Sequence, residues 1–285
     1  MAHESVKITV LVDYASKEGL ETEHGFAAWI EAGERHILFD TGQTGAMQVN
    51  AAKLGIDLKQ AETLVLSHGH FDHTGTLPEV LNENPAVHVY FAHGLHVDRY
   101  SCKPDTPVRS IGIPEASRQA LSRLPVEQLH DLTAHHYLAP GIGITGPVPR
   151  NSSFEDVGGP FFLDHNSHQD DLIEDDQSMW FETDDGLVIL LGCCHAGLVN
   201  TIDYIRKISG VSKVHGVIGG MHLVNADQQR LDRTFEAMAG WKAEFLVPCH
   251  CTGANAAEQM QKTIGSDIVK QGYAGMLIPV GKLNI

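Results

Sequence analysis

The sequence has few basic residues and no long apolar run, and each of these shortages excludes a class of protein. Only 20 of its 285 residues are Lys or Arg, against 36 Asp or Glu, so the formal charge is −16. Because a phosphate backbone normally meets a basic protein face, this balance argues against a nuclease and against a nucleic-acid partner. No apolar run approaches the roughly 20 residues needed to span a bilayer, so no membrane association is expected.

The cysteines are also few, and their positions argue against a disulfide framework. There are five, an odd number, and four of them adjoin histidines: Cys193 and Cys194 precede His195, while Cys249 and Cys251 flank His250. Disulfide frameworks are evenly paired and spread along the chain. The N-terminus has no basic segment leading into an apolar core, so no signal peptide is predicted. We therefore expect a cytoplasmic protein.

The strongest signal for chemistry is a histidine cluster in residues 66–75, Leu-Ser-His-Gly-His-Phe-Asp-His-Thr-Gly. In an extended or turning backbone, His68 and His70 can face one point, and Asp72 and His73 offer an oxygen and a nitrogen beside it. A solvated histidine-rich loop is the alternative. The density of ligand-type side chains favours a metal site, with enough ligands for two ions.

The cluster lies on a predicted turn between a strand and a helix. The apolar run Thr63 to Leu66 predicts a buried strand before it. Thr76 as a cap and Pro78 in the first turn predict a helix after it. Side chains on such a turn open into a cleft while the backbone stays fixed, as a metal site requires.

Each of three predicted strands in the second half runs into a turn that carries a histidine. The pairs are Leu187–Leu191 with His195, Val214–Ile218 with His222, and Phe245–Val247 with His250. Loops at one end of a sheet assemble the sites of α/β proteins, so we expect these histidines to converge with the first cluster.

The first half predicts a similar alternation of strands and helices. Lys7–Val12 alternates polar and apolar residues and predicts an edge strand. Two more strands are expected at Ala27–Ile30 and His36–Phe39. Apolar residues at helical spacing then predict a helix that ends near Gly55.

Residues 101–176 interrupt this rhythm with eight prolines, so only Glu115–Leu124 is expected to be helical there. No low-complexity tract, repeat or linker divides the chain. We therefore expect one domain over residues 1–285, in which the 101–176 segment is an insertion that shapes a substrate pocket.

The His-x-His-x-Asp-His run resembles the signature of the metallo-β-lactamase superfamily of αββα metallohydrolases. Residues 25–30 and 35–42 resemble the strand pair and Asp-Thr-Gly turn that open this fold. With residues 192–195, 217–223 and 248–253, they are similar to the branch of 7,8-dihydropterin-6-methyl-4-(β-D-ribofuranosyl)aminobenzene-5′-phosphate synthase-like proteins. The resemblance implies an α/β sandwich in which two mixed sheets pack face to face with helices outside.

The resemblance also implies two divalent metal ions as cofactors. It divides the ligands between two sites, with His68, His70 and His195 at the first and Asp72, His73 and His250 at the second. Imidazole nitrogens favour zinc, and a mixed nitrogen and oxygen set also admits iron or manganese.

Two departures from the family pattern concern the later ligands. The Gly-His-Thr-Pro-Gly segment that supplies the third histidine in many relatives is absent, and Glu174–Ser178 stands in that region. Many relatives also bridge the metals with an Asp after a strand-end Gly, where this chain has Gly192-Cys193. Cys193 is therefore interpreted as a thiolate ligand, a substitute bridge or a small buried residue.

His222 is a further candidate, because two preceding glycines let the backbone approach another group closely. It would bind a substrate phosphate or donate a proton to a leaving group; the alternatives are metal ligation in place of His195 and a hydrogen-bonded core position. Asp40 is expected to orient a metal-bound histidine rather than to touch metal. Spacing does not distinguish three other pocket candidates, His24, His165 and His168.

Together these features predict a metal-dependent hydrolase that acts on an ester or phosphoester of a small anionic substrate. Two ions would acidify a shared water and stabilise developing charge, and Asp72 would hold or deprotonate that water. No Gly-x-Ser-x-Gly elbow is present to supply a serine nucleophile. The acidity of the chain does not exclude an anionic substrate, because metal cations reverse the local potential.

The branch resemblance implies a different reaction, in which a pterin is joined to an aminobenzene ribofuranosyl phosphate with the metals as Lewis acids. A pterin-related transferase is therefore the second hypothesis. A non-catalytic metal-containing ligand sensor and oxygen or redox chemistry at iron are further alternatives. The oligomeric state is left open, with a homodimer as one option.

Overall fold

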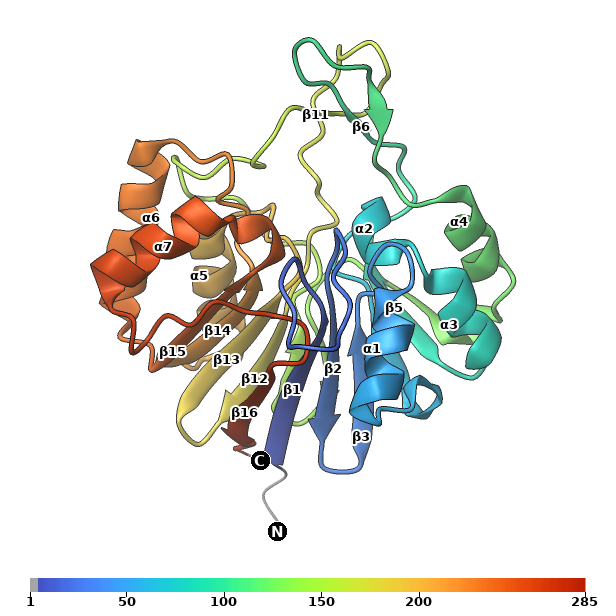
Figure 1. The fold of residues 1–285 in the computed structure, drawn as a ribbon, viewed down its shortest axis with the longest axis horizontal. Coiled ribbons are helices and arrows are strands. Elements are labelled where there is room, and N and C mark those ends of the chain that lie inside the picture. The colour runs from blue at the N-terminus through green and yellow to red at the C-terminus, as the bar shows by residue number, and fades with distance from the viewer. Residues whose placement is uncertain (1–4, 285) are drawn as a thin grey trace.

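The computed structural model describes residues 5–284, and its larger β-sheet has seven strands (Figure 1). In spatial order they are β16 (Leu277–Lys282), β1 (Ser5–Val12), β2 (Ala27–Ala32), β3 (Arg35–Phe39), β4 (Thr63–Val65), β5 (His88–Ala92) and β8 (Leu129–Leu132). Pairing is antiparallel from β16 to β3 and parallel from β3 to β8. The sheet is therefore mixed.

The second large sheet has six strands and is also mixed. In spatial order they are β15 (Phe245–Cys249), β14 (Val214–Gly220), β13 (Gly186–Leu191), β12 (Met179–Thr183), β10 (Ile142–Ile144) and β9 (His136–Ala139). The first three run parallel, and the remaining pairings are antiparallel. Three parallel strands thus end on the same edge, where the predicted ligand loops begin.

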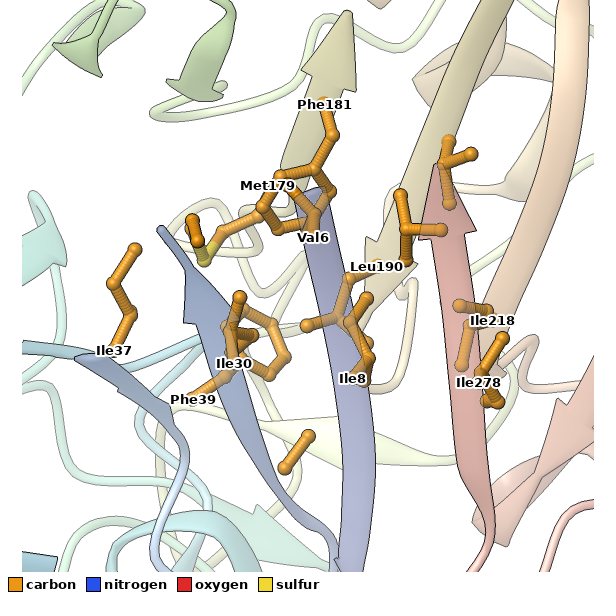
Figure 2. Packing of buried hydrophobic residues seen from close by; sticks show 14 of the residues in the cluster. Val6, Ile8, Ile30, Ile37, Phe39, Met179, Phe181, Leu190, Ile218 and Ile278 are labelled. Carbon is orange, nitrogen blue, oxygen red and sulfur yellow. The ribbon is translucent and has the colours of Figure 1, made fainter. Parts of the chain in front are cut away.

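The two sheets pack face to face over an apolar core (Figure 2). In β1, residues Val6, Ile8 and Val10 point into this core and are almost completely buried. They meet Met179 and Leu190 from the other sheet. Burying one such side chain contributes about 1.5–3 kcal/mol relative to leaving it exposed, so this layer holds the two halves together.

Helices cover the outer face of each sheet (Figure 1). On the first sheet lie α1 (Ala46–Leu54), α3 (Leu77–Glu83) and α4 (Glu115–Ser122), and on the second lie α5 (Leu198–Ser209), α6 (Gln228–Trp241) and α7 (Ala254–Ile264). The apolar stripe of α6 shows why: Leu231, Phe235, Met238 and Trp241 recur at helical spacing and are all buried. The expected sandwich of two mixed sheets between helices is confirmed.

The prediction of an edge strand at Lys7–Val12 was wrong. β1 pairs with β2 on one side and with β16 on the other, with Ile8 opposite Ile30 and Ile278. The edge is formed by β16, whose Pro279 and Gly281 are unfavourable signals for a strand in the sequence. An edge position tolerates both, because one side of the strand needs no ladder hydrogen bonds.

Residues 101–176 contribute strands to three sheets, the two large ones and a small third one. Strands β8, β9 and β10 belong to the two large sheets. The short strands β7 (Arg109–Ser110) and β11 (Phe161–Phe162) pair with β6 (Tyr100–Ser101), which begins just before this segment. These three form a small sheet, here called the cover sheet, that stands above the edge of the sandwich (Figure 1). Within residues 5–284, no helix is long and apolar enough to cross a membrane.

Candidate metal centre

The four predicted ligand loops meet at one edge of the sandwich. The first cluster follows β4, and His195, His222 and His250 follow β13, β14 and β15. The ring of His195 lies 4.8 Å from that of His68 and 4.3 Å from that of His222, and the ring of His250 lies 5.1 Å from that of His73. The expected convergence of separate loops is therefore present in the fold.

His68, His70 and His195 form one possible ligand group. Their candidate ligand atoms all lie within 4.8 Å of one another, and all three residues are buried. His68 Nε2 and His70 Nδ1 are 3.0 Å apart. Two ring nitrogens so close need a proton or a cation between or beside them, and two ligands of one tetrahedral zinc ion are separated by a similar ~3.3 Å.

The orientation of these rings leaves lone pairs free. The Nδ1 of His195 donates to the carbonyl of Val157 at 2.8 Å, so its Nε2 must be the unprotonated nitrogen. That Nε2, and the Nε2 of His70, have no hydrogen-bond partner within the described chain. Burial, followed by repulsion from neighbouring histidines or Arg99, lowers the pKa of each of the three rings well below its usual range. They are thus neutral at pH 7, as metal ligands require.

Asp72, His73 and His250 form a second possible group. The short helix α2 (Phe71–Thr74) carries Asp72 and His73, and Oδ2 of Asp72 lies 3.3 Å from His250 Nε2 and 3.7 Å from His73 Nε2. Burial by itself raises the pKa of Asp72, but the charges and hydrogen bonds of His73 and His250 outweigh it and hold that pKa far below its usual range. An ionised carboxylate between two imidazoles suits a divalent cation.

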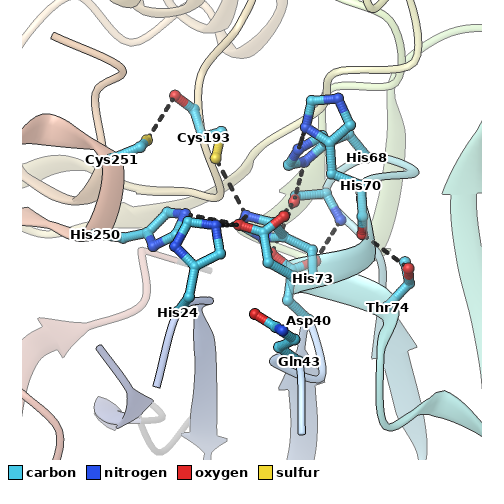
Figure 3. Close-up of polar contacts among 12 residues, drawn as sticks. His24, Asp40, Gln43, His68, His70, His73, Thr74, Cys193, His250 and Cys251 are labelled. Carbon is cyan, nitrogen blue, oxygen red and sulfur yellow. Dashed lines mark hydrogen bonds and ion pairs between the residues drawn. The ribbon is translucent and has the colours of Figure 1, made fainter. Parts of the chain in front are cut away.

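Cys193 lies between the two groups (Figure 3). Its Sγ is 3.1 Å from His73 Nε2, and it also falls within 4.8 Å of the ligand atoms of His68, His195 and His250. Burial raises the pKa of this thiol well above its usual range. A cation beside the sulfur would be needed to stabilise the thiolate. The position fits all three interpretations left open by the sequence, because the residue is buried and its sulfur lies beside ligand atoms of both groups.

Cys251 is a candidate ligand that sequence reasoning did not select. Its Sγ joins Cys193 and His250 in a further group of possible ligand atoms, and it contacts the carbonyl of Cys193 at 3.5 Å (Figure 3). Cys249 instead turns inward, where its Sγ contacts the carbonyl of Val247. Strand alternation would place two thiols that are two positions apart on the same face, so the sequence holds no signal that separates them. They separate because Cys249 ends β15 and Cys251 lies in a 3-10 turn, η3 (His250–Thr252).

Asp40 is completely buried and hydrogen-bonds to residues of the first ligand cluster. Its Oδ2 accepts hydrogen bonds from His73 Nδ1 and from Ser67 Oγ, both at 2.7 Å, and its Oδ1 accepts from the Ser67 amide. Because the Ser67 hydroxyl proton is used on Asp40, its oxygen accepts from His68 Nδ1 at 2.9 Å. One carboxylate therefore orients two candidate ligands, His73 directly and His68 through a serine.

Asp40→Asn is expected to weaken metal binding about 10–100-fold, because one carboxylate oxygen becomes an NH2 donor that faces either the Ser67 amide or the His73 ring and the Ser67 hydroxyl, all of which donate to Asp40. Competition with a chromogenic chelator measures this change. The matched control is Asp57→Asn, which alters an exposed carboxylate that caps a short 3-10 helix, η1 (Leu58–Gln60). An unchanged metal affinity in Asp40→Asn would show that the histidines are oriented by other contacts.

The segment that replaces the family's third-histidine loop supports two of the ligand loops. Asp175 accepts a hydrogen bond from the amide of Gly69, between His68 and His70, at 2.8 Å. Asp176 accepts from the amide of Ala196, next to His195, at 2.9 Å, and burial raises the pKa of Asp176 to about 6. The segment thus supplies acceptors for the ligand-bearing backbone rather than a ligand of its own.

His222 is buried beside the first group. Its ring lies next to His195, and its backbone is in the left-handed region at φ 43°. Its Nδ1 has no hydrogen-bond partner within residues 5–284, so it is not the satisfied core histidine that was one interpretation of the sequence. Burial, reinforced by positive charge on His250 and Arg230, lowers the pKa of His222 to about 3.

This shift predicts that the metal-free protein loses stability in acid. Between pH 6.5 and about 3, unfolded His222 binds a proton that the folded ring does not, so stability falls as the pH falls, by up to about 1.4 kcal/mol per pH unit. The free energy of unfolding, measured with urea in the presence of chelator, should fall between pH 7 and pH 5 in both proteins. The fall should be about 2 kcal/mol smaller in His222→Asn than in the unsubstituted chain. Equal losses for the two proteins would contradict the assignment.

Two further residues reach the centre without a clear sequence signal. His24 Nε2 lies 3.2 Å from Asp72 Oδ2, and the Tyr14 hydroxyl is 2.5 Å from His24 Nδ1. Tyr14 also stacks on the ring of His250 at 5.1 Å. The other two histidines left open by the sequence do not line this pocket: His165 packs on Tyr100 of the cover sheet, and His168 is exposed.

The centre opens into a cavity of about 430 Å³. Asp72, Cys193 and His222 lie on its floor together with His70 and His250. Phe161 of the cover sheet forms part of its wall, with its ring 5.5 Å from those of His70 and His195. A cavity of this size admits a small organic molecule to the proposed ligands.

Comparisons with known proteins agree with this architecture. Residues 21–203 match the model of the metallo-beta-lactamase superfamily. A 7,8-dihydropterin-6-methyl-4-(beta-D-ribofuranosyl)-aminobenzene-5'-phosphate synthase from Methanocaldococcus jannaschii is 28% identical, over 96% of this chain and 97% of its own length.

Two solved structures are similar as well. Tm1679, described as a metal-dependent hydrolase of the beta-lactamase superfamily, has a TM-score of 0.81 and 28% identity, covering 97% of this chain and 99% of that one. Zn²⁺-bound PqqB from Methylobacterium extorquens has a TM-score of 0.58 and 13% identity, covering 96% and 100%, which shows likeness of fold alone. Since the family match spans more than half of its residues, the chain belongs to the metallo-beta-lactamase superfamily.

Proposed function

We propose that this chain is a metal-dependent hydrolase whose dinuclear centre activates water against an ester or phosphoester of a small anionic substrate. The observation that carries the proposal is the adjacency of two possible ligand groups, His68/His70/His195 and Asp72/His73/His250, with Cys193 between them at the floor of one cavity. Zinc is the proposed metal, with iron or manganese as alternatives, since the donors are imidazole, carboxylate and thiol.

The residues around the centre offer the donor atoms that two divalent cations require. The unpartnered nitrogens of His70 and His195, and the Nδ1 of His250, are buried polar atoms whose desolvation is otherwise uncompensated. When bound, two divalent cations supply Lewis acidity and acidify a water molecule. The protein is then required to hold the ligands rigidly, which Asp40, Asp175 and Asp176 do through hydrogen bonds to ligand rings or ligand loops.

Asp72 and His222 are the proposed catalytic side chains. Asp72 faces the cavity with an ionised carboxylate, so its oxygen can accept a hydrogen bond from the attacking water and orient it. His222 lies across the same floor, next to His195, and can hydrogen-bond to the departing oxygen. The ring of Phe161 packs beside the rings of His70, His195 and His222, where it would keep bulk water away from them.

A panel of reporter substrates tests the proposal. Protein prepared without chelator and loaded with zinc, iron or manganese is assayed on phosphodiester, phosphomonoester, thioester and lactone reporters. We expect turnover of at least one reporter, lost on chelation and restored by metal. Stoichiometric metal with no turnover of any reporter, together with tight pterin or nucleotide binding, would contradict the proposal and favour a ligand sensor.

A pterin-related transferase is the second candidate function, since the similarity to the synthase covers nearly the whole of both chains. The aromatic side chains of Tyr14, Phe71 and Phe161 line the cavity and offer faces for a pterin ring. Incubating the metal-loaded protein with an activated 6-methyl dihydropterin and an aminobenzene ribofuranosyl phosphate tests it. Formation of the joined product would favour the transferase, and hydrolysis alone would favour the first proposal.

A further inference from the structure

The cover sheet brings two cations to the mouth of the cavity. Lys103 lines it from the connection between β6 and β7, and Arg109 lines it from the first position of β7; they are the only Lys or Arg among the described residues that do so. The lining contains a single carboxylate, Asp72, which is itself a proposed metal ligand. In a chain with a formal charge of −16, this mouth is therefore locally positive.

Neither cation has a partner in the fold. Across residues 5–284, the side chains of Lys103 and Arg109 make no hydrogen bond or ion pair, and both are exposed. Arg99, at the base of the same cover sheet, behaves differently, because it is 2% exposed and bound to Asp171 and Asp175. Arg99 therefore stabilises the fold through ion pairs. Within the described part of the chain, Lys103 and Arg109 make no such pair and line the cavity instead.

The backbone holds these cations at a defined place relative to the metal centre. Ser101 of β6 pairs with Phe161 of β11, and the Cys102 amide donates to the carbonyl of Pro160 at 3.1 Å. Phe161 in turn packs against His195. The connection between β6 and β7 is therefore tied to the segment that covers the metal ligands.

The size of the cavity leaves room for more than the reacting group. About 430 Å³ exceeds what one phosphate or ester group occupies, and the lining also includes the aromatic side chains of Phe71 and Phe161. Apolar and aromatic walls favour an apolar or planar body between two polar ends.

We propose that Lys103 and Arg109 bind a second anionic group of the substrate, a phosphate or carboxylate separated by an aromatic or apolar body from the bond placed over the metal centre. The inference rests on the proposed function in one respect, that the reacting bond lies at the floor. The two cations then act as a specificity site, because a substrate without the distal anion leaves them unpaired.

Binding of three probes to the metal-loaded chain tests the proposal without requiring turnover. The probes are non-hydrolysable aryl phosphonates that differ only at the distal position, which carries a second phosphonate (the stand-in for a phosphate), a carboxylate or an uncharged amide. Calorimetry should show the chain binding the two charged probes about tenfold or more tightly than the amide probe, with the difference shrinking as salt is raised. The order of the charged probes distinguishes a distal phosphate from a distal carboxylate.

Two double variants decide which residues are responsible. K103A/R109A should lose the preference for the charged probes while keeping its affinity for the amide probe. K207A/K282A removes the same charge from exposed positions that do not line the cavity, and it should keep the preference. Equal binding of all three probes by the unsubstituted chain, or a preference retained by K103A/R109A, would overturn the site. Reporter turnover without a probe preference would overturn this site alone and leave the hydrolase proposal standing.

Discussion

Replacing His250 by alanine is expected to lower kcat/KM on a phosphodiester reporter by at least about a thousandfold, roughly 4 kcal/mol of transition-state stabilisation. His250 Nε2 lies 3.3 Å from Asp72 Oδ2, so its removal takes a nitrogen from the second ligand group and frees the carboxylate. The backbone amide of His250 donates to Asp13 at 2.9 Å, and alanine keeps that bond. Metal analysis of the purified variant should show the loss of one of two equivalents.

His88→Ala is the matched control, because it removes an exposed histidine far from the ligand groups, on β5. It should retain two equivalents and full turnover. If His250→Ala keeps both the second equivalent and its rate, the second ligand group is wrongly assigned, whatever the behaviour of the first.

Cys193→Ala is the other substitution with a large expected effect. Because the Cys193 sulfur lies within ligand distance of both groups, its loss should reduce the affinity for both ions and lower kcat/KM by about 100- to 1,000-fold. Cys193→Asp should recover a large part of the activity, since a carboxylate oxygen can also bridge two cations. Metal titration followed by activity assays on the two variants measures both effects.

The control for this substitution is the adjacent thiol. Cys194 is also fully buried, but its Sγ contacts Thr201 of α5 rather than the ligand groups. Cys194→Ala therefore carries a similar packing cost without touching the centre. Full metal content and turnover in Cys193→Ala would assign Cys193 to packing alone.

The parts of the fold that could be predicted were those in which local pattern and tertiary environment agree. The strands before His68, His195 and His250 are short apolar runs that end in polar ligand-type residues, and the structure has strands there. Parallel strands place their carboxyl ends on one edge, so the meeting of these loops followed from topology rather than from any single contact.

The missed elements are those whose stability depends on a partner distant in sequence. Strand β16 contains Pro279 and Gly281, and its residues form a strand because β1 offers an unpaired edge more than 260 residues earlier in the chain. The cover sheet consists of two-residue strands between prolines, which no periodicity can indicate. Two of its strands pair across about 60 residues of chain, Ser101 with Phe161, so this pairing is not visible locally.

Side-chain hydrogen-bond networks could not be predicted from the sequence for a similar reason. In the sequence, Asp175 and Asp176 stand where the family's third-histidine motif is missing, and nothing assigns them a role. In the fold, each accepts a hydrogen bond from a ligand loop. His24 had no distinguishing neighbour in sequence, yet its ring reaches Asp72. Such contacts join residues 20 or more positions apart, so they become visible only when the chain is folded.

The central claim is that separate loops of this chain hold two cations side by side, and anomalous X-ray diffraction from crystals of protein purified without chelator tests it most directly. Data collected at the absorption edges of zinc, iron and manganese should show two peaks about 3.5–4 Å apart. One peak should lie against His68, His70 and His195, and the other against Asp72, His73 and His250. An absence of peaks after metal loading, or peaks that touch none of these side chains, would contradict it.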